Sequence, residues 1–250
     1  MLLAKYSHFQ TYSENAYPRA FFIVYFMKKK TAIVVDGGFF IKRYRSIIRA
    51  TSLDPIRTAN DLWTMCIKHL EQAKSEKYDL YRIFYYDCLP YDKKQHNPVT
   101  GKALDFSKTD QYKFQVAFFE ELRKKRKVAL RLGVLEDKNK WIIKPSKTKD
   151  LLNGKIAISD LTENDVQFDF TQKMVDMKIG LDIASITLKK QVDQIILIAG
   201  DSDFVPAAKL ARREGIDFLL DPMWNPIKPH LFEHIDGLHS TFKQYKSTKK

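Results

Sequence analysis

The sequence predicts an α/β sandwich with a mostly parallel sheet. Helical patterns alternate with continuous apolar runs, and an uninterrupted run of this kind is typical of a strand that is buried on both faces. Alternation of strands and helices favours parallel pairing, because a parallel pair needs a crossover helix. The predicted strands are Ala32–Val35, Leu80–Tyr86, Ile195–Ala199 and Asp217–Leu220.

Helices are expected between these strands, at Ala59–Ala73, Gln172–Leu188 and Pro206–Arg213. The last of them precedes Gly215, a residue that commonly follows a helix end. We interpret residues 91–169 as an insertion. It holds a basic helix (Thr109–Lys127), a β-hairpin that starts at Val128 and returns at Trp141 after the turn Glu136–Lys140, and a Lys-rich loop.

Two end segments are set apart from the single domain expected over residues 27–242. Residues 1–26 are rich in Tyr and Phe without a period, and Met27 precedes a clean strand, so we interpret them either as a disordered or wrongly assigned start or as an added arm. Residues 243–250 are expected to form a short basic tail.

Composition limits the class of protein. The 250 residues are 44% hydrophobic and 29% charged, which is typical of a globular chain with its own core. The formal net charge of +13 favours a polyanionic partner such as nucleic acid. Cys66 and Cys88 are too few for a disulfide framework or a Cys-rich zinc site, and they indicate reduced thiols and a cytoplasmic location. No segment has the length of a membrane span.

Aspartates occur where the predicted strands end. Asp36, Asp87 and Asp201 each follow an apolar run, and Asp203 comes two residues later, where the next helix begins. Ligands of parallel α/β sheets bind beyond the carboxyl ends of the strands, so these residues are expected at one edge. Asp176 is expected to join them from the helix Gln172–Leu188.

Carboxylates that gather in this way repel one another unless a cation lies among them, and oxygen ligands suit Mg²⁺ or Mn²⁺. The alternative for any one of them is a helix cap or a turn residue. That alternative is open above all for Asp87, and Asp182 is expected to have a structural or outer-shell role. The segment Gly200-Asp201-Ser202-Asp203 is a more specific signal, because two acids this close together repel each other and are expected only where they have a function.

Four motifs occur in the order of a known family: Val35-Asp36-Gly-Gly-Phe, Phe84-Tyr-Tyr-Asp87, Gln172-Lys-Met-Val-Asp176 with Leu181-Asp182, and Gly200-Asp201-Ser202-Asp203-Phe-Val-Pro206. Over residues 30–240 the chain resembles the NYN domain of the bacterial LabA-like type, within the PIN-like nuclease superfamily. The resemblance implies a Rossmann-like three-layer fold and a metal-dependent ribonuclease site. It places Asp36, Asp176, Asp201 and Asp203 at the acidic positions and Phe39 where the family often has Asn.

Substrate contacts are expected from basic residues. Lys173 and Asp176 are three apart, so on a helix they share a face, where Lys173 could neutralise phosphate oxygens or pair with Asp176. The run Arg123, Lys124, Lys125, Arg126 and Lys127 indicates either a nucleic-acid patch or a solvated helix end. With Arg131, Lys140, Lys144, Lys147 and Lys149 it is predicted to form a basic wall beside the acidic edge.

Other residues have structural interpretations. Phe39, Tyr85, Tyr86 and Trp141 are expected in the core more than against bases. His230 and His234 share a helix face near Glu233, but without a third histidine we do not expect a zinc site.

Two functions from different classes follow. The first is a Mg²⁺- or Mn²⁺-dependent ribonuclease, in which Asp36, Asp176, Asp201 and Asp203 hold the metal, with Asp87, Asp182 and Ser202 around them. The alternative is a non-catalytic RNA- or nucleotide-binding regulatory module of the same fold, which Phe39 favours. A hydrolase of small phosphorylated molecules is disfavoured by the large basic excess. A homodimer is left open, and no membrane partner is expected.

Overall fold

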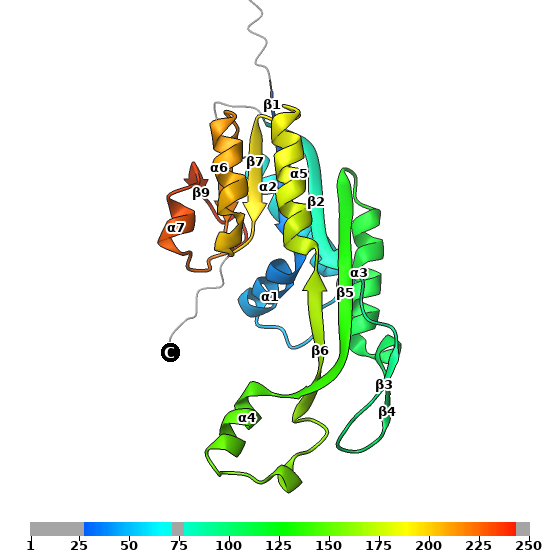
Figure 1. The fold of residues 1–250 in the computed structure, drawn as a ribbon. Coiled ribbons are helices and arrows are strands. Elements are labelled where there is room, and N and C mark those ends of the chain that lie inside the picture. Colours follow the sequence, from blue (N-terminus) through cyan, green and yellow to red (C-terminus); the bar gives the residue numbers. More distant parts are fainter. Residues whose placement is uncertain (1–27, 72–77, 244–250) are drawn as a thin grey trace, which may run out of the picture.

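The computed structural model describes residues 28–71 and 78–243. Within these ranges seven strands form one sheet in the order β6-β5-β2-β1-β7-β8-β9 (Figure 1). The main strands are β1 (Lys29–Asp36), β2 (Tyr78–Cys88), β5 (Val128–Ile143), β6 (Val166–Lys173), β7 (Gln194–Ile198), β8 (Asp217–Asp221) and β9 (Gly237–Leu238). All neighbours pair in parallel except β5 and β6. The mostly parallel α/β sandwich predicted from the sequence is confirmed.

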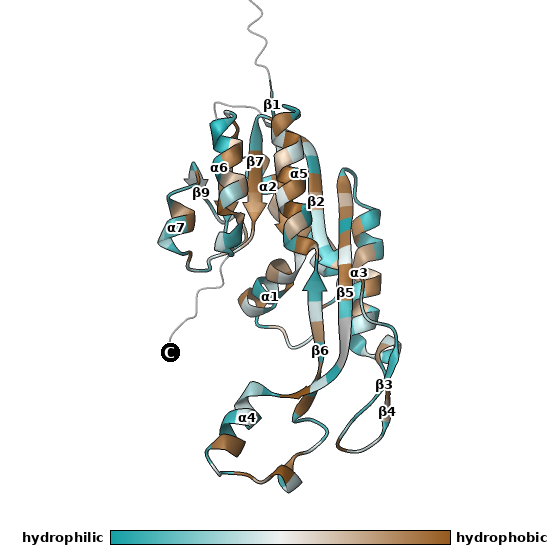
Figure 2. Ribbon diagram, viewed as in Figure 1, coloured by the Kyte–Doolittle hydropathy of each residue, from teal (hydrophilic) through white to brown (hydrophobic). Residues whose placement is uncertain are grey.

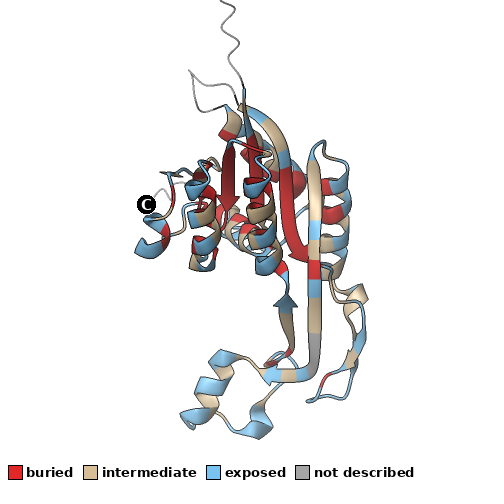
Figure 3. Ribbon diagram, turned by 45° about the horizontal axis from the view of Figure 1, so that its top comes forward, coloured by how far each residue is buried: buried red, intermediate tan, exposed pale blue. Residues whose placement is uncertain are grey.

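Helices cover both faces of the sheet. On one face lie α1 (Gly37–Ile48), α2 (Pro55–Leu70) and α3 (Asp110–Arg123), which bury Ile33 and Val35 of β1. On the other face α5 (Val175–Leu188) and α6 (Val205–Arg213) bury Ala32 and Val34, the alternate residues of the same strand. Both faces of β1 are therefore apolar, which explains its continuous hydrophobic run. Figure 2 shows this apolar centre, and Figure 3 shows that the central strands are buried.

The expected hairpin at residues 128–143 is wrong. These residues form the single strand β5, whose first half pairs with β2 and whose second half pairs with β6. The polar stretch that we expected to turn instead produces an irregular register between Asp137 and Trp141. The chain needs no turn there, because β6 supplies the antiparallel partner from a segment in which no strand was expected.

The insertion is also smaller than expected. Helix α3 and the first half of β5 complete a parallel crossover from β2, so they belong to the sandwich itself. The additional parts are two. One is the small hairpin of β3 (Lys94–His96) and β4 (Ala103–Asp105), followed by the short helix η1 (Phe106–Lys108). The other, here called the β5–β6 arm, comprises residues 134–173 and includes α4 (Pro145–Leu152) and η2 (Ile158–Asp160).

Aromatic rings fill the base of the β5–β6 arm. Phe168 and Phe170 of β6 pack with Tyr91 and Phe106 at ring-centroid separations of 4.9–5.7 Å. Trp141 meets Phe168 edge to face at 5.5 Å. The expectation that Trp141 packs with other apolar residues agrees with this cluster, and Tyr85 and Tyr86 are fully buried in the main core.

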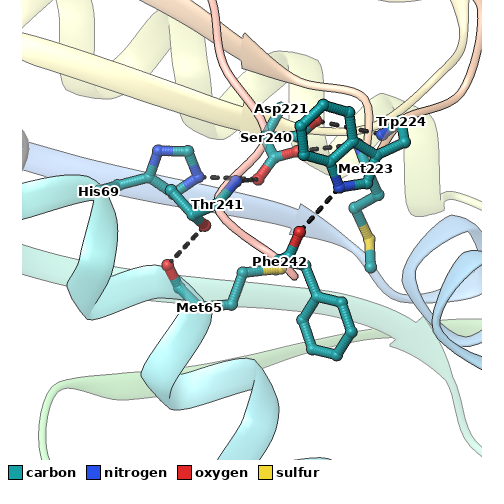
Figure 4. A network of polar contacts seen from close by, with 8 residues as sticks. All are labelled: Met65, His69, Asp221, Met223, Trp224, Ser240, Thr241 and Phe242. Carbon is teal, nitrogen blue, oxygen red and sulfur yellow. Dashed lines mark hydrogen bonds and ion pairs between the residues drawn. The ribbon is translucent and has the colours of Figure 1, made fainter. Parts of the chain in front are cut away.

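A buried His–Asp contact lies where residues 239–242 pack against the sandwich (Figure 4). His69 of α2 lies 2.8 Å from Asp221 at the end of β8, and both side chains are almost completely excluded from solvent. Thr241 donates its hydroxyl proton to the Met65 carbonyl at 2.9 Å, and the Trp224 indole donates to the Phe242 carbonyl at 2.7 Å. These contacts hold residues 239–242 against α2.

Several smaller expectations can be compared with the structure. Cys66 and Cys88 are both buried and unpaired. None of the helices in the described ranges is both long and apolar enough to cross a membrane. Residues 1–26 and almost all of the 243–250 tail lie outside the described residues.

Candidate metal centre at the carboxyl edge

Four predicted aspartates come from three separate places in the fold. Strands β1 and β7 are parallel neighbours, with Val35 paired to Ile198, so Asp36 and the Asp201–Asp203 loop leave the sheet at the same edge. Helix α5 begins at this edge and has Asp176 in its first turn (Figure 1). We call Asp36, Asp176, Asp201 and Asp203 the acidic group.

Asp36 is fixed by the start of α1. Its side chain caps the helix, with Oδ1 accepting a hydrogen bond from the Phe39 backbone amide at 3.1 Å. The next residue has to be glycine, because a Cβ at Gly37 would lie 2.5 Å from the Tyr86 carbonyl oxygen and 2.7 Å from the Tyr85 ring. The start of α1 therefore packs directly against β2. This packing fixes the backbone position from which the Asp36 side chain extends.

Asp203 lies on a short 3₁₀ turn, η3 (Ser202–Phe204), between β7 and α6, and Asp201 immediately precedes this turn. The Asp201 carboxylate caps this turn by accepting a hydrogen bond from the Asp203 amide at 3.1 Å. Gly200 just before it packs against Phe39, since a Cβ there would lie 2.5 Å from the Phe39 ring. Phe39 therefore has a packing role beside the acidic group.

The start of α5 differs from the expected one. Gln172 and Lys173 end strand β6, and Met174 adopts a left-handed backbone with φ of 73° before the helix begins at Val175. Lys173 therefore does not share a helix face with Asp176. It pairs instead with Glu136 of β5 at 2.6 Å, across the antiparallel β5–β6 pair.

Electrostatics show that the acidic group is close enough to interact. Burial raises the pKa of Asp36, and the charges of Asp176 and Asp201 raise it further, against the lowering effect of backbone amides. The pKa of Asp176 is raised by burial and then by Asp201 and Asp203. Within the described ranges, no Lys or Arg forms an ion pair with any of the four.

The donor set fits a hard divalent cation. Mutually repelling carboxylates without a cationic partner are stabilised in their charged form by a bound Mg²⁺ or Mn²⁺. The group is open rather than tight: among described residues, no three of these acids bring an oxygen each within 4.8 Å of one another. Such spacing suits a cation that keeps several water ligands.

Asp87 lies behind the acidic group, on the neighbouring strand. It is buried, its Oδ1 accepts a hydrogen bond from the Cys88 amide at 2.7 Å, and the Tyr85 hydroxyl donates to its Oδ2 at 3.4 Å. Burial raises the pKa of Asp87 to about 6, and the charge of Asp36 contributes to the rise. Asp87 is therefore coupled to the acidic group without being exposed to a substrate.

Asp182 belongs to a different network. It accepts hydrogen bonds from the Tyr86 hydroxyl at 2.8 Å and from Arg131 Nε at 3.1 Å, further along α5. These contacts agree with the structural role that we expected. Arg131 therefore forms an ion pair with Asp182 and does not contribute to a basic wall beside the acidic group.

The basic run Arg123–Lys127 is not beside the acidic group. It immediately precedes β5, and β5 is parallel to β1 and β2, so the run lies at the amino end of the sheet, opposite the carboxyl edge. Its side chains make local contacts: Arg123 with Glu120, Lys124 with Glu121, Lys125 with Asn60 and Lys127 with the Leu80 carbonyl. Of the alternatives left open, the structure favours a solvated helix end.

Other lysines lie on the correct side. Because β5 runs past the carboxyl edge into the β5–β6 arm (Figure 1), Lys140, Lys144 and Lys149 lie beyond the acidic group, and so does Lys147, which pairs with Asp165 at 3.5 Å. Lys228 was not anticipated. It donates a hydrogen bond to the Ser202 hydroxyl at 3.4 Å, between the two acids of η3. Its only sequence signal is a cation next to Pro229, which is too general to identify a site.

Gln172 is a second residue that the sequence did not indicate. A Cβ on Gly38 would lie 3.7 Å from the Gln172 side-chain oxygen and 3.6 Å from Asp36 Oδ1, so both side chains are close to Gly38 at the start of α1. A groove of about 290 Å³ begins at the acidic group and runs between α5 and α6. Asp176 and Asp203 line it together with small residues such as Gly180 and Ala207.

Comparison with known families gives one match, over the middle and later part of the chain. The family model of the NYN domain matches residues 106–223, just under half of the sequence. This segment is similar to the NYN domain, a PIN-like nuclease family. The NYN match contains Asp176, Asp201 and Asp203, whereas Asp36 lies outside it and is added by β1. The LabA-like subtype stays a prediction.

Other comparisons are less informative. A crystal structure of a protein of unknown function from Vibrio parahaemolyticus matches 84% of this chain and 91% of its own, with 17% sequence identity and a TM-score of 0.43. No curated protein matches the chain.

Proposed function

We propose that this protein is a metal-dependent ribonuclease that hydrolyses RNA phosphodiester bonds at the carboxyl edge of its sheet. The observation that carries the proposal is the convergence of Asp36, Asp176 and Asp201–Asp203 at one edge of the sheet, where neighbouring carboxylates add to the rise in the pKa of Asp36 and of Asp176, and no Lys or Arg of the described residues forms an ion pair with any of the four. The expected location is the cytoplasm.

Asp36, Asp176 and Asp201 would hold Mg²⁺ or Mn²⁺ directly or through water, and Asp203 would complete the set. The bound metal would supply a water of lowered pKa and polarise the scissile phosphate. Two of these carboxylates are already held in position by backbone hydrogen bonds: Asp36 accepts from the Phe39 amide, and Asp201 accepts from the Asp203 amide. A carboxylate held in this way loses little conformational freedom when it binds a metal.

Substrate binding is assigned to cations on the same side of the sheet. Lys228 lies at Ser202 and is placed to neutralise phosphate oxygens next to the acidic group. The lysines of the β5–β6 arm would contact the RNA backbone further away, and such contacts make binding sensitive to salt. Among the cations that the sequence indicated, the run Arg123–Lys127 is not assigned this role, because it lies at the opposite edge.

Cleavage of a labelled RNA with Mg²⁺, Mn²⁺ or EDTA tests the proposal. Asp201→Asn is expected to abolish cleavage, because it removes one charge from the acidic group and preserves size. Asp79→Asn is the matched control, since Asp79 is an exposed aspartate near the start of β2, at the opposite edge. Full activity of Asp201→Asn, or cleavage by the wild type in EDTA, would contradict the proposal.

A second function is favoured by one observation. Phe39 packs its ring against Gly200 where the family often has Asn, so this position offers no polar group to a substrate or metal. A non-catalytic RNA- or nucleotide-binding regulatory module would bind labelled RNA with salt-dependent affinity and leave it intact with either metal. The same assay, combined with a filter-binding measurement, separates the two functions.

A further inference from the structure

Three side chains of metal-ligating types lie on one turn just after the segment that the NYN model matches. Residues of α7 (Pro229–Phe232) continue in a helical turn through Glu233, with the Glu233 amide donating to the Pro229 carbonyl at 3.1 Å. His230, Glu233 and His234 each bring one ligand atom within 4.8 Å of the others, and theirs is the one such group among the described residues. All three are at least partly exposed, so an ion can reach them.

The two imidazole rings already have the spacing that a shared metal requires. Their centroids are 5.2 Å apart and their planes are at 84°. A zinc ion bound by two histidines at about 2.0–2.1 Å in tetrahedral geometry would place the ring centroids roughly 5 Å apart. Closing the site therefore needs side-chain rotations and no movement of the backbone turn.

The surrounding charges permit binding. Arg212 donates to Asp236 at 2.8 Å and to the Glu233 carbonyl at 3.2 Å, and it forms no ion pair with the Glu233 carboxylate. No hydrogen bond or ion pair to another described residue engages that carboxylate.

We propose that His230, Glu233 and His234 form a binding site for one borderline divalent metal ion of the zinc class, with water in the fourth position. Imidazole nitrogen selects Zn²⁺ over Mg²⁺, whereas the all-oxygen acidic group has the opposite preference. The two sites are thus chemically distinct. They are also neighbours, because α7 packs beside η3 and Lys228, two residues before His230, contacts Ser202.

The sequence by itself does not predict zinc here, because no third histidine has a suitable spacing. In the structure the third ligand is the carboxylate of Glu233, which the helical turn brings alongside both rings. An ion at this turn would also fix Lys228 relative to the acidic group.

Zinc titration of the full-length, EDTA-treated and dialysed protein tests the inference, with calorimetry for stoichiometry and visible absorption of a Co²⁺ form for coordination. The wild type is expected to bind one Zn²⁺ and to give a tetrahedral Co²⁺ spectrum. A variant carrying His230→Ala and His234→Ala is expected to lose both signals, and Glu233→Gln to weaken binding at least several-fold. Circular dichroism confirms that the variants are folded.

Two controls make the result specific. His96→Ala removes an exposed histidine of β3 and is expected to bind Zn²⁺ as the wild type does. Asp201→Asn alters the acidic group and is also expected to retain Zn²⁺. Absence of binding by the wild type, unchanged binding by the double variant, or loss of binding in either control would overturn the inference. The Asp201→Asn result keeps this test separate from that of the nuclease.

Discussion

Replacing Gly37 by alanine should damage both the fold and the site. The new Cβ would lie 2.5 Å from the Tyr86 carbonyl oxygen and 2.7 Å from the ring carbon and hydroxyl of Tyr85. Ordinary contacts begin at 3.4 Å, so these approaches are short by 0.9 Å and 0.7 Å. One neighbour is strand backbone and the other is a fully buried ring, so neither can move away freely.

The expected loss of unfolding free energy is about 2–3 kcal/mol, the upper part of the range for overpacked cores. Because helix α1 would have to shift by a large fraction of an ångström, the Asp36 carboxylate at its cap would be misplaced. A displacement on the order of 1 Å can cost roughly 100-fold in rate. Urea unfolding and RNA cleavage measure the two effects.

Gly38→Ala is the matched control. Its Cβ would meet nothing nearer than 3.6 Å, and alanine restricts the unfolded chain more than glycine does. Its stability is expected to stay within about 1 kcal/mol of the wild type. If Gly37→Ala proved as stable as Gly38→Ala, the close packing of α1 against β2 would be refuted.

Three further predictions concern other parts of the molecule. Burial raises the pKa of Asp87 from 3.8 to about 6, so the folded state holds this proton more tightly than the unfolded state does, and the free energy of unfolding should fall as pH rises from about 4 to 6. Measured in EDTA, Asp87→Asn should remove this contribution, which is worth roughly 3 kcal/mol. A pH profile of stability that is the same in the variant and the wild type would contradict the prediction. His69→Ala removes the side-chain partner of the buried Asp221, which keeps only the backbone amides of Met223 and Thr241, and should cost about 1.5–3 kcal/mol in urea unfolding, whereas Thr241→Val, which loses one hydrogen bond, should cost about 1 kcal/mol. Gly180→Ala adds a methyl group inside α5 where nothing lies within 4 Å, and it should raise the melting temperature by a few degrees, equivalent to about 0.5–1 kcal/mol.

Local signals in the sequence identified the strands that form the centre of the sheet. Their apolar runs are continuous because both faces are covered, and this holds for β1, β2 and β7 alike. The aspartates that follow these runs could be placed at one edge because parallel strands share their carboxyl ends. Helix α1 was not predicted, because Gly37 and Gly38 are poor helix formers and the Asp36 cap compensates for them only in the folded chain.

The location of the basic run could have been derived from the sequence. A segment that leads into a parallel strand lies at the amino edge, so Arg123–Lys127 had to be opposite the aspartates once the following strand was parallel. Instead, that strand was assigned to an inserted hairpin. The mistaken turn and the mistaken placement thus have a single cause.

The sequence alone determined which residues carry the charge, which runs are strands and where each strand ends, since these depend on neighbours along the chain. The tertiary structure decided which distant residues meet: Lys173 pairs with Glu136, and Lys228 reaches Ser202. Such pairings depend on strand order, on the direction of β6 and on the backbone turn at Met174. Those features are set by packing between distant segments, and no local pattern encodes them.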